Sequence, residues 1–105
     1  MLSLCLENLK HLVKITFPIS EHPALIQRLK NNQQIITTRV SDEFNKYHVG
    51  NIVKSDLNYN LKVLKIKSFK NIKNHPYFNE LNKNQISIIQ KYPQFQVIWL
   101  KKQNK

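Results

Sequence analysis

The sequence of 105 residues predicts a single α+β domain, in which a small mixed or antiparallel β-barrel is capped by two helices. The length suits one compact domain. Stretches rich in β-branched and aromatic residues alternate with helical patterns in the order strand, helix, three strands, helix, strand. No strand–helix–strand rhythm is long enough for a parallel sheet. A small barrel is therefore the economical arrangement.

The first half of the chain is expected to supply a strand, a helix and a second strand. Residues 12–17 have the composition of a strand, which stops at Pro18. Ser20 is expected to cap a helix that ends at residues 31–32. Strict alternation of side chains over residues 34–40 then predicts the strongest strand of the chain.

The second half is expected to supply three strands and a helix. Gly50, the only glycine, predicts a turn with positive φ before a strand over 52–54. In the strand over 59–69 the apolar positions slip by one residue between Val63 and Leu64, which predicts a β-bulge. Asn82 and Gln85 have the spacing of a capping box for a helix that ends at Pro93. Residues 95–101 form the closing strand.

The net charge of the chain is +11 and lies mostly in its second half. Residues 1–50 carry six Lys+Arg against four acids, whereas residues 51–105 carry eleven lysines against two acids. A basic surface on one side of a small domain is typical of polyanion binders, because neutralised phosphates release counterions. A coding sequence rich in A and T would also enrich lysine, asparagine and isoleucine. The charge alone therefore does not establish that the chain binds a polyanion.

Composition excludes several classes of protein. One glycine excludes a Gly-rich nucleotide loop, and one cysteine fits a reducing compartment, so a cytoplasmic location is expected. No apolar run approaches the roughly 20 residues of a membrane span. The four histidines and Cys5 lack ligand-like spacing, so neither a metal site nor a cofactor is expected. His22 and His75 each precede a proline, which favours turn or surface positions.

The domain itself is predicted to span residues 12–101. Residues 1–11 are an apolar extension, and residues 102–105 are a basic tail. Leu2, Leu4 and Leu6 would support a homodimer, which is the basis for one functional alternative, an interaction protein.

Arg39 is a candidate binding residue, since it is one of only two arginines in a lysine-rich chain. Strand alternation places it on the same face as Thr37. A guanidinium offers a rigid fork to a phosphate or carboxylate, whereas lysine offers only a point charge. The alternative is an ion pair with Asp42 or Glu43 that holds the following loop.

The chain resembles the ASCH domains of the PUA-like superfamily over residues 12–101, and among them the small acetylcytidine amidohydrolases. The resemblance rests on residues 15–17 and their following helix, the Thr37-x-Arg39 strand, Tyr47-x-x-Gly50, the 61–69 strand, and the closing helix, Tyr92-Pro93 and strand. It implies a PUA-like barrel whose cleft receives a nucleobase, nucleoside or RNA.

The resemblance also implies which residues would carry an amidohydrolase reaction. In those enzymes a lysine, a threonine and a glutamate act together, with the lysine three residues before the threonine. Thr37 matches the threonine, but Gln34 stands at the lysine position, and Glu80 is the only carboxylate near the glutamate position. Glutamine has no titrating amine, so only Lys30 is left as a substitute base.

Two functions follow from these residues. The preferred hypothesis is an RNA- or nucleotide-binding module that uses a PUA-like cleft and a basic face and has lost catalysis. No membrane partner is expected. The alternative is an amidohydrolase of acylated nucleobases or nucleosides that uses Thr37, Lys30 and Glu80. For the binding module, the expected contacts are phosphates and an unpaired base that stacks on a tyrosine. The residues assigned to them are Arg39, Gln34, Tyr47, Lys62, Lys65, Lys67 and Tyr77.

Overall fold

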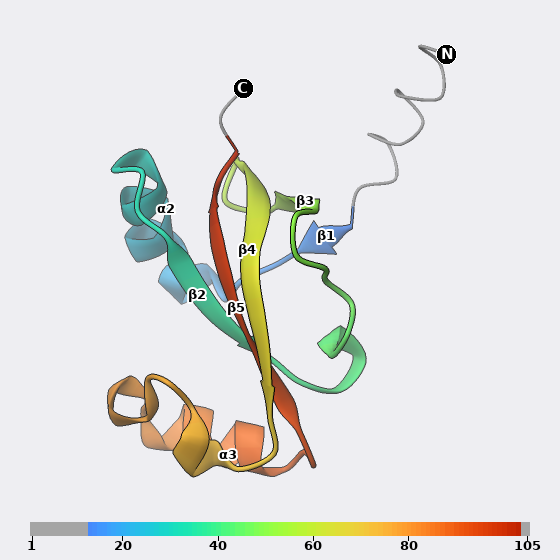
Figure 1. Ribbon diagram of the computed structural model, residues 1–105. Helices are drawn as coiled ribbons and strands as arrows, with labels where there is room; N and C mark the ends of the chain where they lie inside the picture. Colours follow the sequence, from blue (N-terminus) through green and yellow to red (C-terminus); the bar gives the residue numbers. More distant parts are fainter. Residues whose placement is uncertain (1–12, 104–105) are drawn as a thin grey trace.

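The computed structural model describes residues 13–103 and has the predicted α+β class (Figure 1). Five strands form one mixed sheet in the order β1-β3-β4-β5-β2. The strands are β1 (Lys14–Ile15), β2 (Ile35–Arg39), β3 (Ile52–Ser55), β4 (Asn60–Phe69) and β5 (Phe95–Lys102). The helices are α2 (His22–Lys30) and α3 (Lys83–Gln90), and short 3-10 helices are η1 (Ile19–Glu21), η2 (Ser41–Glu43), η3 (Ile72–Asn74) and η4 (Phe78–Glu80).

The pairing of the strands leaves β1 and β2 at opposite edges of the sheet. β1 is parallel to β3, while β3, β4, β5 and β2 pair antiparallel in that spatial order. Within residues 13–103 no backbone ladder joins β1 to β2. The predicted closure into a barrel is therefore not confirmed, although the mixed sheet and the two helices are.

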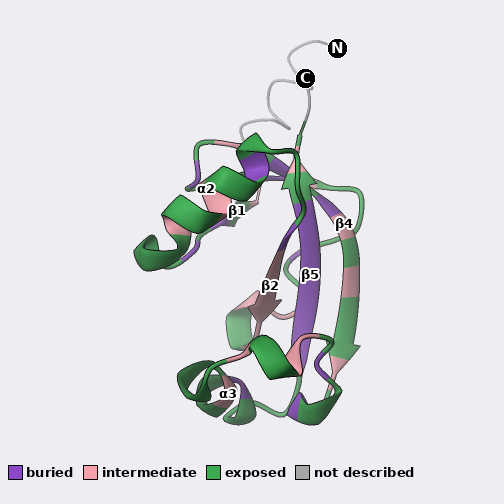
Figure 2. Cartoon of the chain, turned by 90° about the vertical axis from the view of Figure 1, so that its left-hand side faces the viewer, coloured by how far each residue is buried: buried purple, intermediate pink, exposed green. Residues whose placement is uncertain are grey.

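Two hydrophobic cores lie on opposite faces of the sheet. The first core contains Leu61 and Ile98 and is covered by Leu29 of α2. The second core contains Val97 and Trp99 and is covered by α3 and by the turns that precede it. Between them β5 is buried on both faces from residue 95 to 100 (Figure 2). β5 therefore contributes side chains to both cores.

Two early elements differ from the sequence prediction. β1 has only two residues, and after it the Phe17 N–H donates to Asp56 Oδ2 at 3.2 Å and not to a neighbouring strand. Ser20 lies inside η1 and does not cap α2, whose N-cap is Glu21 with no side-chain hydrogen bond. Local composition predicted the elements, but the partner of the Phe17 N–H lies 39 residues away in the sequence.

Three predicted local features are confirmed. The register of β4 against β5 shifts between Val63 and Lys65, where the bulge was expected. Gly50 has a φ of +90°. Asn82 and Gln85 form the reciprocal capping box at the start of α3. The closing strand runs to Lys102, one residue beyond the predicted end of the domain.

The predicted apolar extension and its homodimer contact lie outside the described residues. Within residues 13–103, no helix is both long and apolar enough to cross a membrane. In the same part of the chain, no group of three or more His, Cys, Asp or Glu side chains could hold a metal ion.

Candidate functional site

A groove of about 610 Å³ runs along the outer edge of β2. In Figure 2, β2 lies at the edge of the sheet, with α2 toward one end and α3 toward the other. Side chains from both faces of the strand reach the groove, because an edge strand is open on its outer side. The polar residues that the argument below uses are Thr37, Thr38, Arg39, His75, Tyr77 and Glu80.

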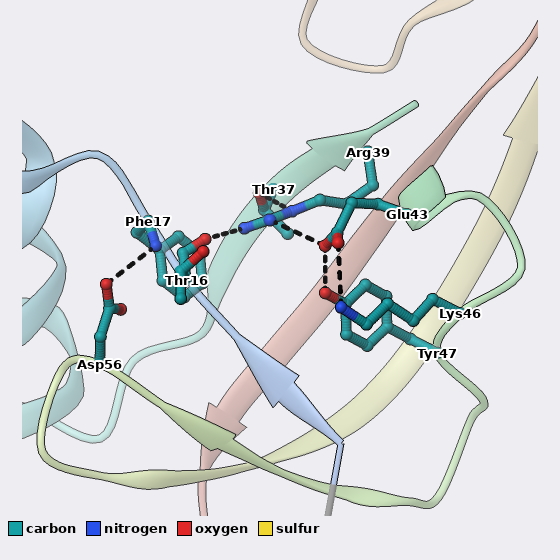
Figure 3. Close-up of polar contacts among 8 residues, drawn as sticks. All are labelled: Thr16, Phe17, Thr37, Arg39, Glu43, Lys46, Tyr47 and Asp56. Carbon is teal, nitrogen blue, oxygen red and sulfur yellow. Dashed lines mark hydrogen bonds and ion pairs between the residues drawn. The ribbon is translucent and has the colours of Figure 1, made fainter. Parts of the chain in front are cut away.

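Arg39 spans the gap between β2 and the chain that follows β1 (Figure 3). Its Nη2 donates to the Thr16 carbonyl at 2.7 Å, and its Nε donates to Thr37 Oγ1 at 3.1 Å. The guanidinium lies 5.0 Å from the centre of the Phe17 ring. It also pairs with Glu43 at 3.2 Å, which is one of the two ion pairs that the sequence left open. Arg39 therefore has a structural role, although it lines the groove.

Glu43 gathers three donors around one carboxylate. Besides Arg39, it accepts a hydrogen bond from Lys46 Nζ at 3.0 Å and one from the Tyr47 hydroxyl. Burial opposes ionisation of this carboxylate, but the hydrogen bonds from Tyr47 and Lys46 and the charges of Lys46 and Arg39 outweigh it, so the net pKa of Glu43 is lowered. η2 is thereby held against the first core.

Tyr47 corrects one sequence prediction. Tyr47 was one of two tyrosines, with Tyr77, expected to stack on an unpaired base, but only 3% of the residue is exposed and it belongs to the first core. Burial, together with the hydrogen bond to Glu43, raises the pKa of its hydroxyl. The ring has no face open to a ligand.

His75 and Thr38 form a pair that the sequence did not indicate. His75 Nε2 lies 2.8 Å from Thr38 Oγ1, and the backbone N–H of Tyr77 donates to His75 Nδ1 at 3.0 Å. Because Nδ1 accepts that hydrogen bond, the neutral ring carries its proton on Nε2 and donates it to Thr38. His75 consequently cannot act as a base that takes the Thr38 proton.

The position of His75 agrees with one of the two positions predicted for it. It lies in a turn, since the Phe78 N–H donates to the His75 carbonyl at 3.1 Å, but it is not at the surface. It is 5% exposed and stacks on Phe95 at 5.5 Å between ring centres. Burial lowers the pKa of its imidazole. The His-Pro dipeptide signalled only a turn. The aromatic partner and Thr38 come from strands distant in the sequence.

Tyr77 is the predicted tyrosine that does reach the groove. It is half-buried, and its hydroxyl accepts a hydrogen bond from Trp99 Nε1 at 3.2 Å. The two ring centres are 6.3 Å apart. Because Trp99 is the only tryptophan in the chain, its fluorescence reports on this wall of the groove.

The three residues of the amidohydrolase hypothesis are not brought together. Thr37 and Glu80 line the groove, but Lys30 lies exposed in the last turn of α2 and does not. Within residues 13–103, no hydrogen bond joins Thr37 to Lys30 or to Glu80; the Thr37 hydroxyl contacts Arg39. Gln34, at the position of the family lysine, is exposed before β2 and outside the groove lining.

Lys62, Lys65 and Lys67 are exposed on one face of β4, as the bulge implied. Lys65 Nζ lies 5.0 Å from the Trp99 ring centre. Lys67 pairs across the sheet with Val97, which pairs with Thr38 on its other side. Residues paired in this way share a face, so the three lysines lie on the same side of the sheet as Thr38.

Comparisons with known proteins support the fold alone. No protein-family model matches the chain, and no curated protein sequence matches it significantly. The crystal structure of the hypothetical protein PH0355 is similar, with a TM-score of 0.57, 12% sequence identity, and coverage of 86% of this chain and 97% of that one. At this identity the likeness concerns the arrangement of the elements.

Proposed function

We propose that the chain is an RNA- or nucleotide-binding module of the PUA-like ASCH type, whose groove receives an unpaired nucleotide. The observation that carries this proposal is the set of hydrogen-bond donors on β2. Thr37 and Thr38 each accept a hydrogen bond through Oγ1, from Arg39 and His75 respectively. Each hydroxyl therefore has its own proton left for an acceptor in the groove.

The chemistry of the groove suits a nucleotide. A volume of about 610 Å³ is within the range of small-molecule sites. The threonine hydroxyls can donate to carbonyl or phosphate oxygens, and the half-buried Tyr77 ring can stack on a base. Glu80, exposed in η4, can accept from an exocyclic amine.

Binding is favoured over hydrolysis because the groove supplies no activated nucleophile. The His75 tautomer donates to Thr38 and cannot withdraw its proton. The Thr37 hydroxyl is next to a guanidinium, which does not act as a base. An amidohydrolase reaction would need a base within about 3 Å of the hydroxyl, or one water away.

The test is a titration of the protein with nucleotides and short RNA, followed through Trp99 fluorescence. Tyr77→Leu removes the stacking ring and is expected to weaken binding about 5- to 150-fold, since a stacked base is worth about 1–3 kcal/mol. The matched control is Tyr92→Leu, because Tyr92 is exposed and does not line the groove.

Three outcomes would contradict the proposal. One is an absence of nucleotide and RNA binding at low salt. Another is equal binding by the Tyr77→Leu and Tyr92→Leu variants. The third is turnover of acetylcytidine by the wild-type protein, which would favour the amidohydrolase alternative.

A further inference from the structure

The face of the sheet that carries the second core also carries more lysines than the three on β4. Strand pairing places Lys14 of β1 beside Lys54 of β3, and Lys62 of β4 beside Lys101 of β5. Lys54 in turn pairs with Asn60, two residues before Lys62 on the same strand, so both pairs share one face. With Lys65 and Lys67, six exposed lysines form this array, which we term the lysine face.

The opposite side of the same strands fixes the orientation of the lysine face. Ile15, Val53 and Leu61 alternate with these lysines along their strands and are buried in the first core. A slip by one residue would bury the lysines and expose the core, so the register is strongly specified. The six charges are therefore held on one surface by the fold.

Within the described residues, the strands that carry the lysine face contain no carboxylate. The acids described are in 3-10 helices or in the turn between β3 and β4: Glu21, Asp42, Glu43, Asp56 and Glu80. In that part of the chain, none of the six lysines takes part in an ion pair. The six lysines therefore lie on one side of four strands, and none of them is neutralised by an ion pair to a described residue.

The described side chains of the lysine face offer neither an open aromatic ring nor a planar hydrogen-bonding group that could recognise a base. Trp99 is the aromatic residue next to Lys65, but it is 8% exposed, lies under the Lys65 ammonium, and gives its N–H to Tyr77. A lysine ammonium is a point charge without the planar fork that reads a guanine edge. A nucleic acid bound here would therefore be contacted at its phosphates.

We propose that the lysine face binds the phosphodiester backbone of single-stranded nucleic acid without regard to base sequence, as a site separate from the nucleotide groove. This inference rests on the proposed function. A nucleic acid is favoured over an anionic membrane because the large apolar side chains exposed in residues 13–103 do not lie on the strands that carry the lysine face. They are Ile19, Val49, Ile88 and Tyr92, in η1, a loop, α3 and the turn after it.

The experiment measures the salt dependence of binding by the full chain, with fluorescently labelled oligo-U and oligo-dT of equal length. Each phosphate neutralised on a single strand contributes about −0.7 to the slope of log K against log salt, so six lysines predict a slope of about −4. Both oligonucleotides should bind with affinities within a few-fold of each other. A nucleoside monophosphate should not displace them.

Two triple variants with the same loss of charge locate the site. Lys62→Gln, Lys65→Gln and Lys67→Gln together should reduce the magnitude of the slope by about 2. The matched control replaces Lys73, Lys83 and Lys91 by Gln; these exposed lysines lie in η3 or at the ends of α3 and should leave the slope unchanged. Thermal unfolding checks that both variants fold.

The outcomes separate this inference from the proposed function. If both triple variants reduce the slope of log K against log salt by the same amount, binding follows net charge and the lysine face is not the site. The proposed function is then unaffected. A preference of more than tenfold for one base also overturns the inference. If the protein binds phosphatidylserine vesicles through Lys62, Lys65 and Lys67 but no nucleic acid at about 50 mM salt, the inference is wrong. If wild type binds no nucleotide or RNA, the proposed function itself fails.

Discussion

The Arg39 guanidinium donates a hydrogen bond to the Thr16 carbonyl oxygen at 2.7 Å and so joins β2 to the chain that follows β1. These two strands are the edges of the sheet and share no ladder within residues 13–103. One side chain connects them where a barrel would place backbone hydrogen bonds. The consequences of this contact can be measured.

Arg39→Ala should destabilise the fold and cannot serve as a pure test of binding. It removes hydrogen bonds to Thr16, Thr37 and Glu43 and leaves a half-buried carboxylate without one of its partners. Since a hydrogen bond to a charged group is worth about 1.5–3 kcal/mol, the free energy of unfolding should fall by about 2–3 kcal/mol in urea titrations. Arg28→Ala is the control, because Arg28 is exposed; it should change stability by less than about 0.5 kcal/mol.

Tyr47→Phe should cost about 1–2 kcal/mol in the free energy of unfolding, because the ring keeps its packing but Glu43 loses the hydroxyl donor. Urea unfolding measures the difference. Tyr59→Phe removes a hydroxyl that makes no hydrogen bond to the described residues, so its effect should be below about 0.5 kcal/mol. Equal effects of the two substitutions would show that the Tyr47–Glu43 contact contributes nothing.

His75 should make the fold less stable in mild acid. Burial lowers its pKa below the ordinary value of 6.5, so the folded state binds fewer protons than the unfolded state. The contribution of neutral His75 to the free energy of unfolding is complete above pH 6.5. It is lost as the pH falls from there through the pKa of His75 in the folded state. Thermal unfolding between pH 8 and pH 5 should show a slope of at most about 1.4 kcal/mol per pH unit from this group.

Substitution identifies the titrating group. His75→Gln should lower stability at every pH but flatten its decline below pH 6.5. His48→Gln should keep the wild-type pH dependence, because His48 is exposed. A decline that survives in His75→Gln and disappears in His48→Gln would contradict the assignment.

Gly50→Ala should destabilise the fold through the backbone alone. At a φ of +90° an L-residue is strained by about 1–2 kcal/mol, while a Cβ built there meets no atom within 4 Å. Urea unfolding of Gly50→Ala beside Val49→Ala, an exposed neighbour, separates conformation from side-chain loss. No difference between these variants would mean that the turn relaxes without cost.

Features that depend on neighbouring residues could be predicted from the sequence. The β4 bulge follows from a slip in side-chain alternation, and the capping box from Asn82 and Gln85 three residues apart. The Gly50 turn follows from the conformational freedom of glycine. In each case the energy that decides the structure is local.

Features that depend on contacts between residues distant in the sequence could not be predicted from it. The Asp56 carboxylate accepts the hydrogen bond of the Phe17 N–H from 39 residues away, and Thr38 meets His75 from 37 residues away. The pattern around Tyr47 gives no sign that Glu43 and the first core enclose it. The candidate groove is assembled by such contacts, so sequence patterns indicated Thr37, Arg39 and Tyr77 but missed His75 and Thr38.

The position of β5 between the two cores has a consequence for folding kinetics. β2 pairs in the sheet only with β5, and Ile35 lies opposite Leu100, 65 positions later. Closing a loop of that size costs chain entropy before any ladder compensates for it, so such topologies fold slowly. During synthesis, α2 and β2 leave the ribosome long before β5, the strand with which β2 pairs and which contributes to the core under α2. Until then the apolar side of the helix has no sheet to cover, and the nascent chain is most exposed to aggregation in this interval.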